Sequence, residues 1–397
     1  MKKRNYKKPN IFIYYLGKMC AKFFSFFVLR LKVEKNELKK AKKPYVVIAN
    51  HESSIDFFSL LSTIKGRVNM IVSSSYYNTI PIKNLLRLSG VIPKQQFQTS
   101  VSDLKKMKSV LDHDMGLVFY PAGLMTNNGI STIIPKSTGK SLKWFGKDVY
   151  AAISKGSYLT KPKWGNGYRK GKITLNIVKL FTALELKVLS EDEIYKKVVE
   201  TLGYDAYQNQ IENPVAYKKG NDITGLENVL YWCPKCGSEF KMKVINKDTL
   251  ECCCCKNKAK ANKYGLLEKV NESDVIYQSP SNWSRQIISN LEKEYANTLN
   301  FSISSNCQIK MINYDKRKFE TVGTGLITLN NDKFILSATI KDEEKTLEFP
   351  VNRMPTLPNV PGKTFDLQDG SDSYRLILEK PEETIKWVYY TEIINKK

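Results

Sequence analysis

Apolar positions between residues 40 and 202 follow two alternating patterns, one typical of buried strands and the other of amphipathic helices. Short apolar runs predict strands at residues 45–49, 68–72, 117–120 and 149–153. Apolar residues at helical spacing predict helices over residues 57–64 and 101–111, the second with Ser100 as its N-cap. Strand–helix alternation of this kind predicts an α/β domain with a mostly parallel sheet.

The pattern changes after residue 170. Residues 172–186 look extended, and Ser190 opens a helix that runs through Leu202, with acidic residues in its first turn. Residues 206–228 are mostly polar and predict a linker. The α/β domain is therefore expected to occupy residues 36–215.

Beyond Phe301 the chain is rich in β patterns. Residues 326–336 contain two apolar runs around Asn330-Asn331-Asp332, which predicts a hairpin, and a helix with an apolar face is expected at 382–393. Together with a strand at 374–378 and the start at Gly323-Thr324-Gly325, this pattern loosely resembles a pleckstrin-homology-like domain, a curved sheet capped by one helix. We expect such a mainly-β domain at residues 275–397, binding lipid headgroups or a protein, or only packing.

The N-terminus concentrates positive charge. Residues 1–50 carry a net charge of +12, half of the chain's +24, which points to an anionic partner. Lys18, Lys22 and Arg30 interrupt the apolar stretch, so it is a poor candidate for a spanning helix, and no small-residue cleavage site marks a signal peptide. Residues 1–35 are predicted to lie in the interface of an anionic membrane, at its cytoplasmic face, as a peripheral or monotopic segment. The alternative is a buried helix with a basic flank.

Six of the eight cysteines fall in one 23-residue window. Cys233/Cys236 and Cys252/Cys255 form two CxxC pairs with fifteen residues between them. This spacing predicts a zinc ribbon at residues 228–265, in a reducing compartment, with four thiolates around one structural Zn²⁺. Cys253 and Cys254 lie inside the second pair, so an exchange of ligands among these cysteines stays open.

One histidine stands in a pattern suited to acid–base chemistry. His51 follows a predicted strand, and Asp56 comes five residues later. A carboxylate at that place can fix the tautomer of the imidazole and stabilise its charged form, leaving the other ring nitrogen to a substrate hydroxyl. Ser53 and Ser54 favour a turn whose backbone N–H groups are exposed for an anion. A lone histidine is otherwise more often a structural residue.

The stretch from Tyr45 to Leu202 resembles the glycerolipid acyltransferases that acylate lysophosphatidic acid. Their signature of a strand, Asn-His, four residues and Asp is matched by Asn50, His51 and Asp56. A second block, Gly90-Val91-Ile92-Pro93-Lys94, has Lys where Arg is usual. A third, Tyr120-Pro121-Ala122-Gly123-Leu124-Met125-Thr126, corresponds to Phe-Pro-Glu-Gly-Thr-Arg-Ser, and residues 158–162 could serve as a fourth.

The resemblance implies an O-acyltransferase in which His51, oriented by Asp56, deprotonates a lysolipid hydroxyl. That oxygen attacks an acyl thioester carried on acyl carrier protein or coenzyme A, without a covalent acyl-enzyme. The implied substrate-binding residues are Asn50, Ser53, Ser54, Gly90, Lys94, Pro121 and Gly123.

Two residues depart from the family pattern. Ala122 replaces a Glu and Met125 an Arg, which in the family help to bind the acceptor and its phosphate. Either the acceptor differs from lysophosphatidic acid, or Lys94, Lys136 and Lys140 take over anion binding, or the enzyme is impaired.

Two other classes of protein fit parts of the sequence. High basicity and a zinc ribbon are typical of nucleic-acid-binding proteins. The basic residues, however, gather in the aromatic N-terminus and not around the cysteines, so no nucleic-acid partner is expected. The changes at Ala122 and Met125 also suit a non-catalytic lipid-binding relative of the acyltransferases.

Overall fold

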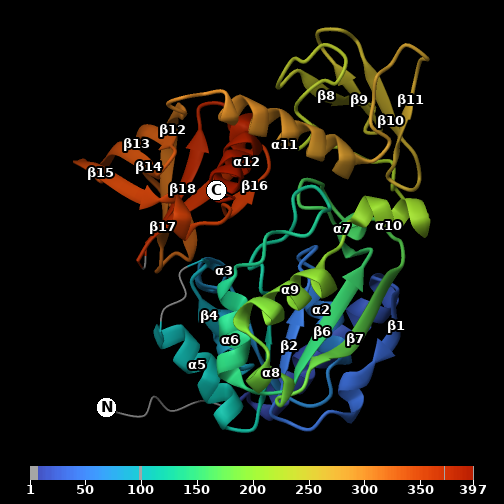
Figure 1. Cartoon of the computed structure of the whole chain (residues 1–397), viewed down its shortest axis with the longest axis vertical. Coiled ribbons are helices and arrows are strands. Elements are labelled where there is room, and N and C mark those ends of the chain that lie inside the picture. Colours follow the sequence, from blue (N-terminus) through green and yellow to red (C-terminus); the bar gives the residue numbers. More distant parts are fainter. Residues whose placement is uncertain (1–7, 98–100, 371, 397) are drawn as a thin grey trace. The chain divides into compact units, whose positions relative to one another are not determined.

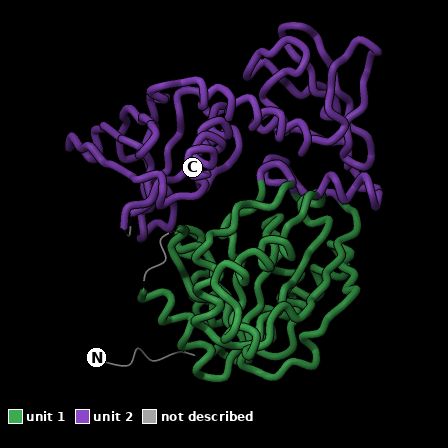
Figure 2. Tube along the Cα trace, viewed as in Figure 1, with its two compact units in different colours: residues 1–126, 130–161, 170–205 green, residues 127–129, 162–169, 206–397 purple. Residues whose placement is uncertain are grey.

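The computed structural model describes residues 8–97, 101–370 and 372–396. The chain divides into two compact units, coloured separately in Figure 2. Unit 1 comprises residues 1–126, 130–161 and 170–205, and unit 2 comprises residues 127–129, 162–169 and 206–397. Two short segments that interrupt unit 1 in the sequence thus belong to unit 2.

Unit 1 is built around a seven-stranded sheet in the order β1-β7-β6-β2-β5-β3-β4 (Figure 1). Its strands are β1 Leu31–Asn36, β2 Val46–Ala49, β3 Val68–Ser73, β4 Ile92–Lys94, β5 Gly116–Phe119, β6 Val149–Lys155 and β7 Ile173–Phe181. Every neighbouring pair is parallel except β6 and β7. The prediction of an α/β domain with a mostly parallel sheet is confirmed.

Helices cover both faces of this sheet, which explains the continuous apolar runs of its strands. They are α1 Ile11–Phe23, α2 Asp56–Thr63, α3 Ser74–Thr79, α4 Lys83–Leu88, α5 Val101–Asp112, α6 Ser137–Phe145, α7 Ser157–Thr160, α8 Glu185–Val188 and α9 Glu191–Leu202. In β2, Val47 and Ala49 pack in a core with α1 and α2, whereas Val46 and Ile48 pack with α5, α6 and α9.

The N-terminal helix of unit 1 is mostly exposed. Together with a π-helical turn at Phe24–Val28, α1 forms an 18-residue helix with a mean hydropathy of 1.4, of which 17% is buried. By length and composition alone this helix could cross a membrane. The attachment of residues 1–35 to the membrane interface stays a prediction.

Unit 2 contains two further sheets. The first has the order β11-β10-β9-β8, with β8 Met242–Ile245, β9 Thr249–Cys252, β10 Lys258–Ala261 and β11 Leu267–Lys269. The second is antiparallel throughout, in the order β15-β14-β13-β12-β18-β17-β16. Its strands are β12 Ser302–Asn313, β13 Lys318–Asn330, β14 Lys333–Ile340, β15 Glu343–Pro350, β16 Asn359–Val360, β17 Thr364–Asp369 and β18 Asp372–Leu378.

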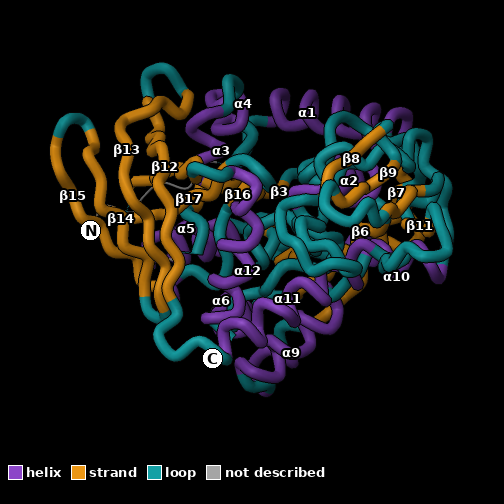
Figure 3. The backbone as a smooth tube through the Cα atoms, turned by 90° about the horizontal axis from the view of Figure 1, so that it is seen from above, coloured by secondary structure: helices purple, strands orange, loops and turns teal. Residues whose placement is uncertain are grey.

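The long strands β12 to β15 lie side by side in Figure 3. The hairpin predicted at residues 326–336 is formed by β13 and β14, and the Asn330 side chain accepts the N–H groups of Asp332 and Lys333 in its turn. Gly323-Thr324-Gly325 lies inside β13 rather than at a strand start. The backbone of β14 approaches Gly323 too closely for a side chain, which explains why this position is a glycine. The pleckstrin-homology-like interpretation stays a prediction.

Three helices complete unit 2: α10 Ala206–Glu212, α11 Pro280–Ala296 and α12 Thr384–Ile394. The linker predicted at residues 206–228 is wrong, since this segment forms α10 and buries Tyr217, Ile223 and Leu226. Its few apolar residues follow no regular period, yet tertiary packing buries most of them. The helix α12 is enclosed almost all round, with only Lys386 and Glu392 outside the buried set, instead of having one apolar face.

Candidate active site

The turn that follows β2 is organised by one carboxylate oxygen. Oδ2 of Asp56 lies 3.1 Å from Nδ1 of His51 and accepts the backbone N–H groups of Glu52 and Ser53 at 2.7 and 2.8 Å. Asp56 is buried, whereas the His51 side chain is 20% exposed. Since Nδ1 is held by the carboxylate, Nε2 is the nitrogen left for a reacting proton.

The sequence explains why this turn forms. Asp56 is the first residue of α2, where the helix N-terminus stabilises negative charge. The expectation that the turn at Ser53 and Ser54 leaves N–H groups free for an anion is wrong for Ser53, because Asp56 accepts its N–H together with that of Glu52. Ser54 itself is exposed.

Two predicted residues fix this turn to its surroundings. The buried Asn50 side chain donates to the carbonyl of Ser154 and accepts its N–H, both at 2.8 Å, so it joins the end of β2 to β6. The Ser53 hydroxyl donates to the carbonyl of Lys161 at 2.7 Å. These contacts hold the turn rather than expose Asn50 and Ser53 to a substrate.

The loop after β5 reaches the same histidine. The Tyr120 ring stacks on His51, with ring centroids 4.3 Å apart and planes 24° from parallel. The Thr126 N–H donates to the His51 carbonyl at 3.3 Å. The third family block therefore borders the His51 turn, and Tyr120 is a neighbour that the sequence did not single out. Its correspondence to the family's Phe was the available signal.

The remaining predicted binding residues lie on other segments of unit 1, after α4, at the end of β4 and after β5. Gly90 has a φ of +79°, and its carbonyl accepts from Asn69, so backbone geometry accounts for this glycine. Lys94 ends β4, and burial lowers the pKa of its amine. Gln96 donates to the carbonyl of the exposed Gly123 at 2.9 Å, which ties the segment after Lys94 to the turn after Pro121. In the described part of the chain, Lys94 forms no direct hydrogen bond with His51 and instead donates to the carbonyl of Gln95.

The departures from the family pattern remove polar groups from the third block. Ala122 is buried and Met125 half-buried. Lys136 and Lys140, which could replace the missing cation, lie exposed at α6.

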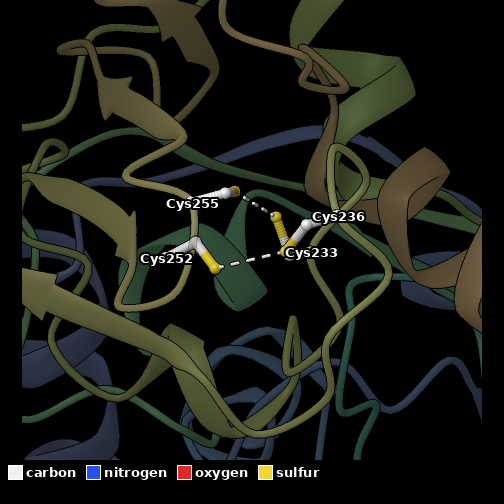
Figure 4. A group of neighbouring side chains, drawn as sticks. All are labelled: Cys233, Cys236, Cys252 and Cys255. Carbon is white, nitrogen blue, oxygen red and sulfur yellow. Dashed lines mark hydrogen bonds between the residues drawn. The ribbon is translucent and has the colours of Figure 1, made fainter.

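A second candidate site lies in unit 2, where the two CxxC pairs meet (Figure 4). The Sγ atoms of Cys233, Cys236, Cys252 and Cys255 all lie within 4.8 Å of one another, with Cys233–Cys255 at 3.6 Å and Cys236–Cys252 at 3.7 Å. Tetrahedral zinc with bonds of about 2.3 Å separates its sulfurs by about 3.8 Å, so the cluster is compatible with zinc. Cys253 and Cys254 are exposed and stand outside it.

Comparisons with known proteins point to acyltransferases. The family model described as Acyltransferase matches residues 30–167. The 1-acyl-sn-glycerol-3-phosphate acyltransferase of Saccharomyces cerevisiae is 27% identical over 198 residues, 47% of this chain. The chain spans 65% of that relative's length.

A solved structure, the 1-acyl-sn-glycerophosphate (LPA) acyltransferase from Thermotoga maritima, shares 22% identity, with a TM-score of 0.41. The match covers 48% of this chain and 78% of that one. The acyltransferase family model thus covers residues 30–167, and the chain has homology to a 1-acyl-sn-glycerol-3-phosphate acyltransferase.

Proposed function

We propose that this protein transfers a fatty acyl group from an acyl thioester to the hydroxyl of a lysophospholipid or related glycerolipid. The observation that carries the proposal is the contact between Asp56 Oδ2 and His51 Nδ1, inside a turn that Asn50 anchors to β6. His51 Nε2 takes the hydroxyl proton while the substrate oxygen attacks the thioester carbonyl. The C–S bond then breaks, and the leaving thiolate receives the proton from His51. A positioned base of this kind contributes about 10²–10⁴-fold.

The acceptor is the less defined substrate. Ala122 and Met125 supply no ionic partner for a phosphate, whereas Lys94 is a half-buried cation at the end of β4. We therefore assign the acceptor to the glycerolipid class without requiring lysophosphatidic acid itself. The donor is acyl carrier protein or coenzyme A thioester.

The test is acyl transfer by the full chain to a panel of lysolipids, with acyl-coenzyme A and acyl carrier protein as donors. His51→Ala should lose turnover by at least about 10²-fold. His113→Ala is the matched control, since it removes the other histidine, which is exposed and belongs to the turn after α5. No turnover on any acceptor, or turnover that His51→Ala leaves unchanged, contradicts the proposal.

We also propose that the four clustered thiols hold one structural zinc ion. Bound as four thiolates, the ion would have no open position for substrate, so no step of acyl transfer is assigned to it. Protein purified under reducing conditions should retain one zinc per chain, and Cys236→Ser should lose it. Cys253→Ser, outside the cluster, is the control and should keep it. Wild-type protein without zinc would refute the site.

Finally, we propose that the N-terminal helix attaches the enzyme to the cytoplasmic face of an anionic membrane, where its lipid acceptor resides. The support is a helix whose large apolar side chains are exposed, among them Phe12, Leu16 and Phe27. Its neighbourhood in the sequence is strongly basic. The same basic charge would also suit a nucleic-acid-binding protein, which is the competing interpretation.

A further inference from the structure

A second carboxyl group lies beside the proposed base. Glu52 follows His51 directly, and its side chain is fully buried. Its Oε1 is 3.2 Å from the Asn50 amide nitrogen and 3.4 Å from the Ser131 hydroxyl. Its Oε2 is buried and has no hydrogen-bond partner among the residues that the structure describes. An ionised carboxylate in this position would have one charged oxygen without a donor and the other with two long contacts only, which is costly. Asp56 also has one buried oxygen without a partner, but its Oδ2 accepts two short backbone N–H bonds and contacts His51.

Counting protons along the contacts of Ser131 leads to the same conclusion. The Ser131 hydroxyl lies 3.2 Å from the carbonyl of Leu202 and 3.4 Å from Oε1 of Glu52. A serine has one hydroxyl proton, and the carbonyl can only accept. If Glu52 carries a proton on Oε1, it donates to Ser131, and Ser131 donates to Leu202. Both contacts of the Ser131 hydroxyl are then hydrogen bonds, and Asn50 still donates to Oε1. If Glu52 were ionised, the single Ser131 proton would face two acceptors.

The charges that face Glu52 are negative. Asp56 and Asp205 both disfavour a further anion, and burial is the largest cause that raises the pKa of Glu52 well above its ordinary value. Hydrogen bonds donated by Asn50 and Ser131 to an ionised Glu52 would act in the opposite direction, but burial and the neighbouring charges outweigh them. Geometry and charge therefore both favour the protonated, neutral form of Glu52.

We propose that Glu52 is a neutral carboxylic acid that positions the His51 turn. It joins Asn50, which is anchored on β6, to Ser131, whose N–H and hydroxyl bind the carbonyls of Tyr204 and Leu202 after α9. Because the group is uncharged, Asp56 is the single negative charge that this turn presents to His51. A second buried anion would stabilise the imidazolium and keep the base protonated. This role rests on the proposed function.

The first test does not need activity. The chain has two histidines, so the ring signals of His51 can be followed by NMR in ¹⁵N-histidine-labelled protein and assigned with His113→Ala. Glu52→Gln keeps the size and neutrality of the side chain, so the His51 titration midpoint should stay within about 0.3 pH units of wild type. If Glu52 were ionised, its removal would lower that midpoint by about one unit or more. That result overturns the proposal.

Infrared spectroscopy gives a second direct reading. Because burial also raises the pKa of Glu392 to about 7, the comparison is made in the Glu392→Gln background. At neutral pH this variant should show a protonated-carboxyl stretch that disappears when Glu52→Gln is added, and absence of this band also overturns the proposal. In the acyl-transfer assay, Glu52→Gln should keep kcat within about threefold of wild type, whereas Glu52→Ala should lose about tenfold or more. A neutral Glu52 in a chain that acylates no acceptor would refute the proposed function and its positioning role, but not the protonation state. Equal kcat in Glu52→Ala and wild type would refute the positioning role alone.

Discussion

At the scale of single residues, the candidate site depends on Asp56 Oδ2, which contacts His51 and closes the turn around it. Asp56→Asn keeps an oxygen that can accept the Glu52 and Ser53 N–H groups but removes the charge that stabilises the imidazolium. We expect kcat to fall by about 10²–10⁴-fold with little change in thermal unfolding. The check is kcat and Tm of the same preparation. A kcat within about threefold of wild type would show that His51 does not act as a base supported by Asp56.

The His51–Asp56 contact could be predicted because it is local, spanning five residues and one turn. The contacts that hold this turn could not. Asn50 bonds Ser154, and Ser53 bonds Lys161, at sequence separations of 104 and 108 residues. Both residues were expected to bind substrate, yet their polar atoms are used by partners that only the folded sheet brings close. The same holds for the stack of Tyr120 on His51.

At the scale of elements, the packing of α6 on α9 depends on a glycine. A Cβ added to Gly139 would lie 2.2 Å from the carbonyl oxygen of Glu191, in the first turn of α9. Helix propensity alone would make Gly139→Ala stabilising by about 1 kcal/mol. Because backbone cannot move aside cheaply, we expect the opposite sign, a loss of about 1–3 kcal/mol in the free energy of unfolding.

Chemical denaturation of Gly139→Ala measures this effect. The matched control is Gly17→Ala, a glycine in α1 where an added Cβ meets nothing within 4 Å. Gly17→Ala should be neutral or stabilising. If both variants gained stability, close approach of α6 and α9 would not be what requires Gly139.

Helices and strands could be predicted where the spacing of apolar residues and their number indicated the same kind of element. The buried strands β2 and β5 and the capped helix α9 follow from their own sequences, and Ser190 and Glu193 form the expected N-terminal cap. The strand β1 was missed because half of the residues in Leu31–Asn36 are charged and the strand pairs with β7 at the edge of the sheet. Composition there indicated a membrane-facing tail, and tertiary pairing overrode it.

At the scale of the whole molecule, segments far apart in the sequence share the core of unit 2. Lys163, from the inserted segment 162–169, places its amine in a buried position where Glu392 of α12 and Asp366 of β17 are the acidic neighbours. Burial lowers the pKa of Lys163 to about 7 and raises that of Glu392 to about 7. The core of unit 2 therefore holds two groups whose charges change near neutral pH.

We expect the stability of unit 2 to fall less with rising pH in Glu392→Gln than in wild type. Because the pKa of Glu392 is raised on folding, its contribution is fully present below its unfolded value of about 4.5 and is lost as pH rises through about 7. Glutamine cannot ionise, so the free energy of unfolding of the variant should rise relative to that of wild type across this window, by on the order of 2 kcal/mol at pH 8. Denaturation at pH 5 and pH 8 measures the gain. Lys163→Met combined with Glu392→Gln should be at least as stable as either single variant.

Equal differences between Glu392→Gln and wild type at the two pH values would show that Glu392 has the same protonation in the folded and unfolded chains. The control is Glu348→Gln, which changes a half-exposed carboxylate that pairs with Lys333 on the surface of the same sheet. It should alter stability by less than about 1 kcal/mol at either pH.

The charge of the whole chain and its exposed N-terminal helix lead to the last prediction. Replacing Phe12, Leu16 and Phe27 with Ser removes three large exposed apolar side chains from one helix. Full insertion of each into lipid would contribute about 1.5–3 kcal/mol, so even partial insertion makes the triple variant bind vesicles at least about tenfold more weakly. Binding of wild type should favour anionic over neutral vesicles and weaken with salt, because Lys and Arg attract the anionic surface.

Sedimentation with lipid vesicles of both compositions provides the measurement. Leu184→Ser with Val188→Ser is the matched control, since these side chains are equally apolar and exposed but lie at α8 in the same unit. If the triple variant bound like this control, charge alone would account for membrane attachment. If wild type ignored vesicles and bound DNA in a salt-sensitive way, the basic N-terminus would serve nucleic acid, and the lipid acceptor would have to reach His51 without membrane attachment of this helix.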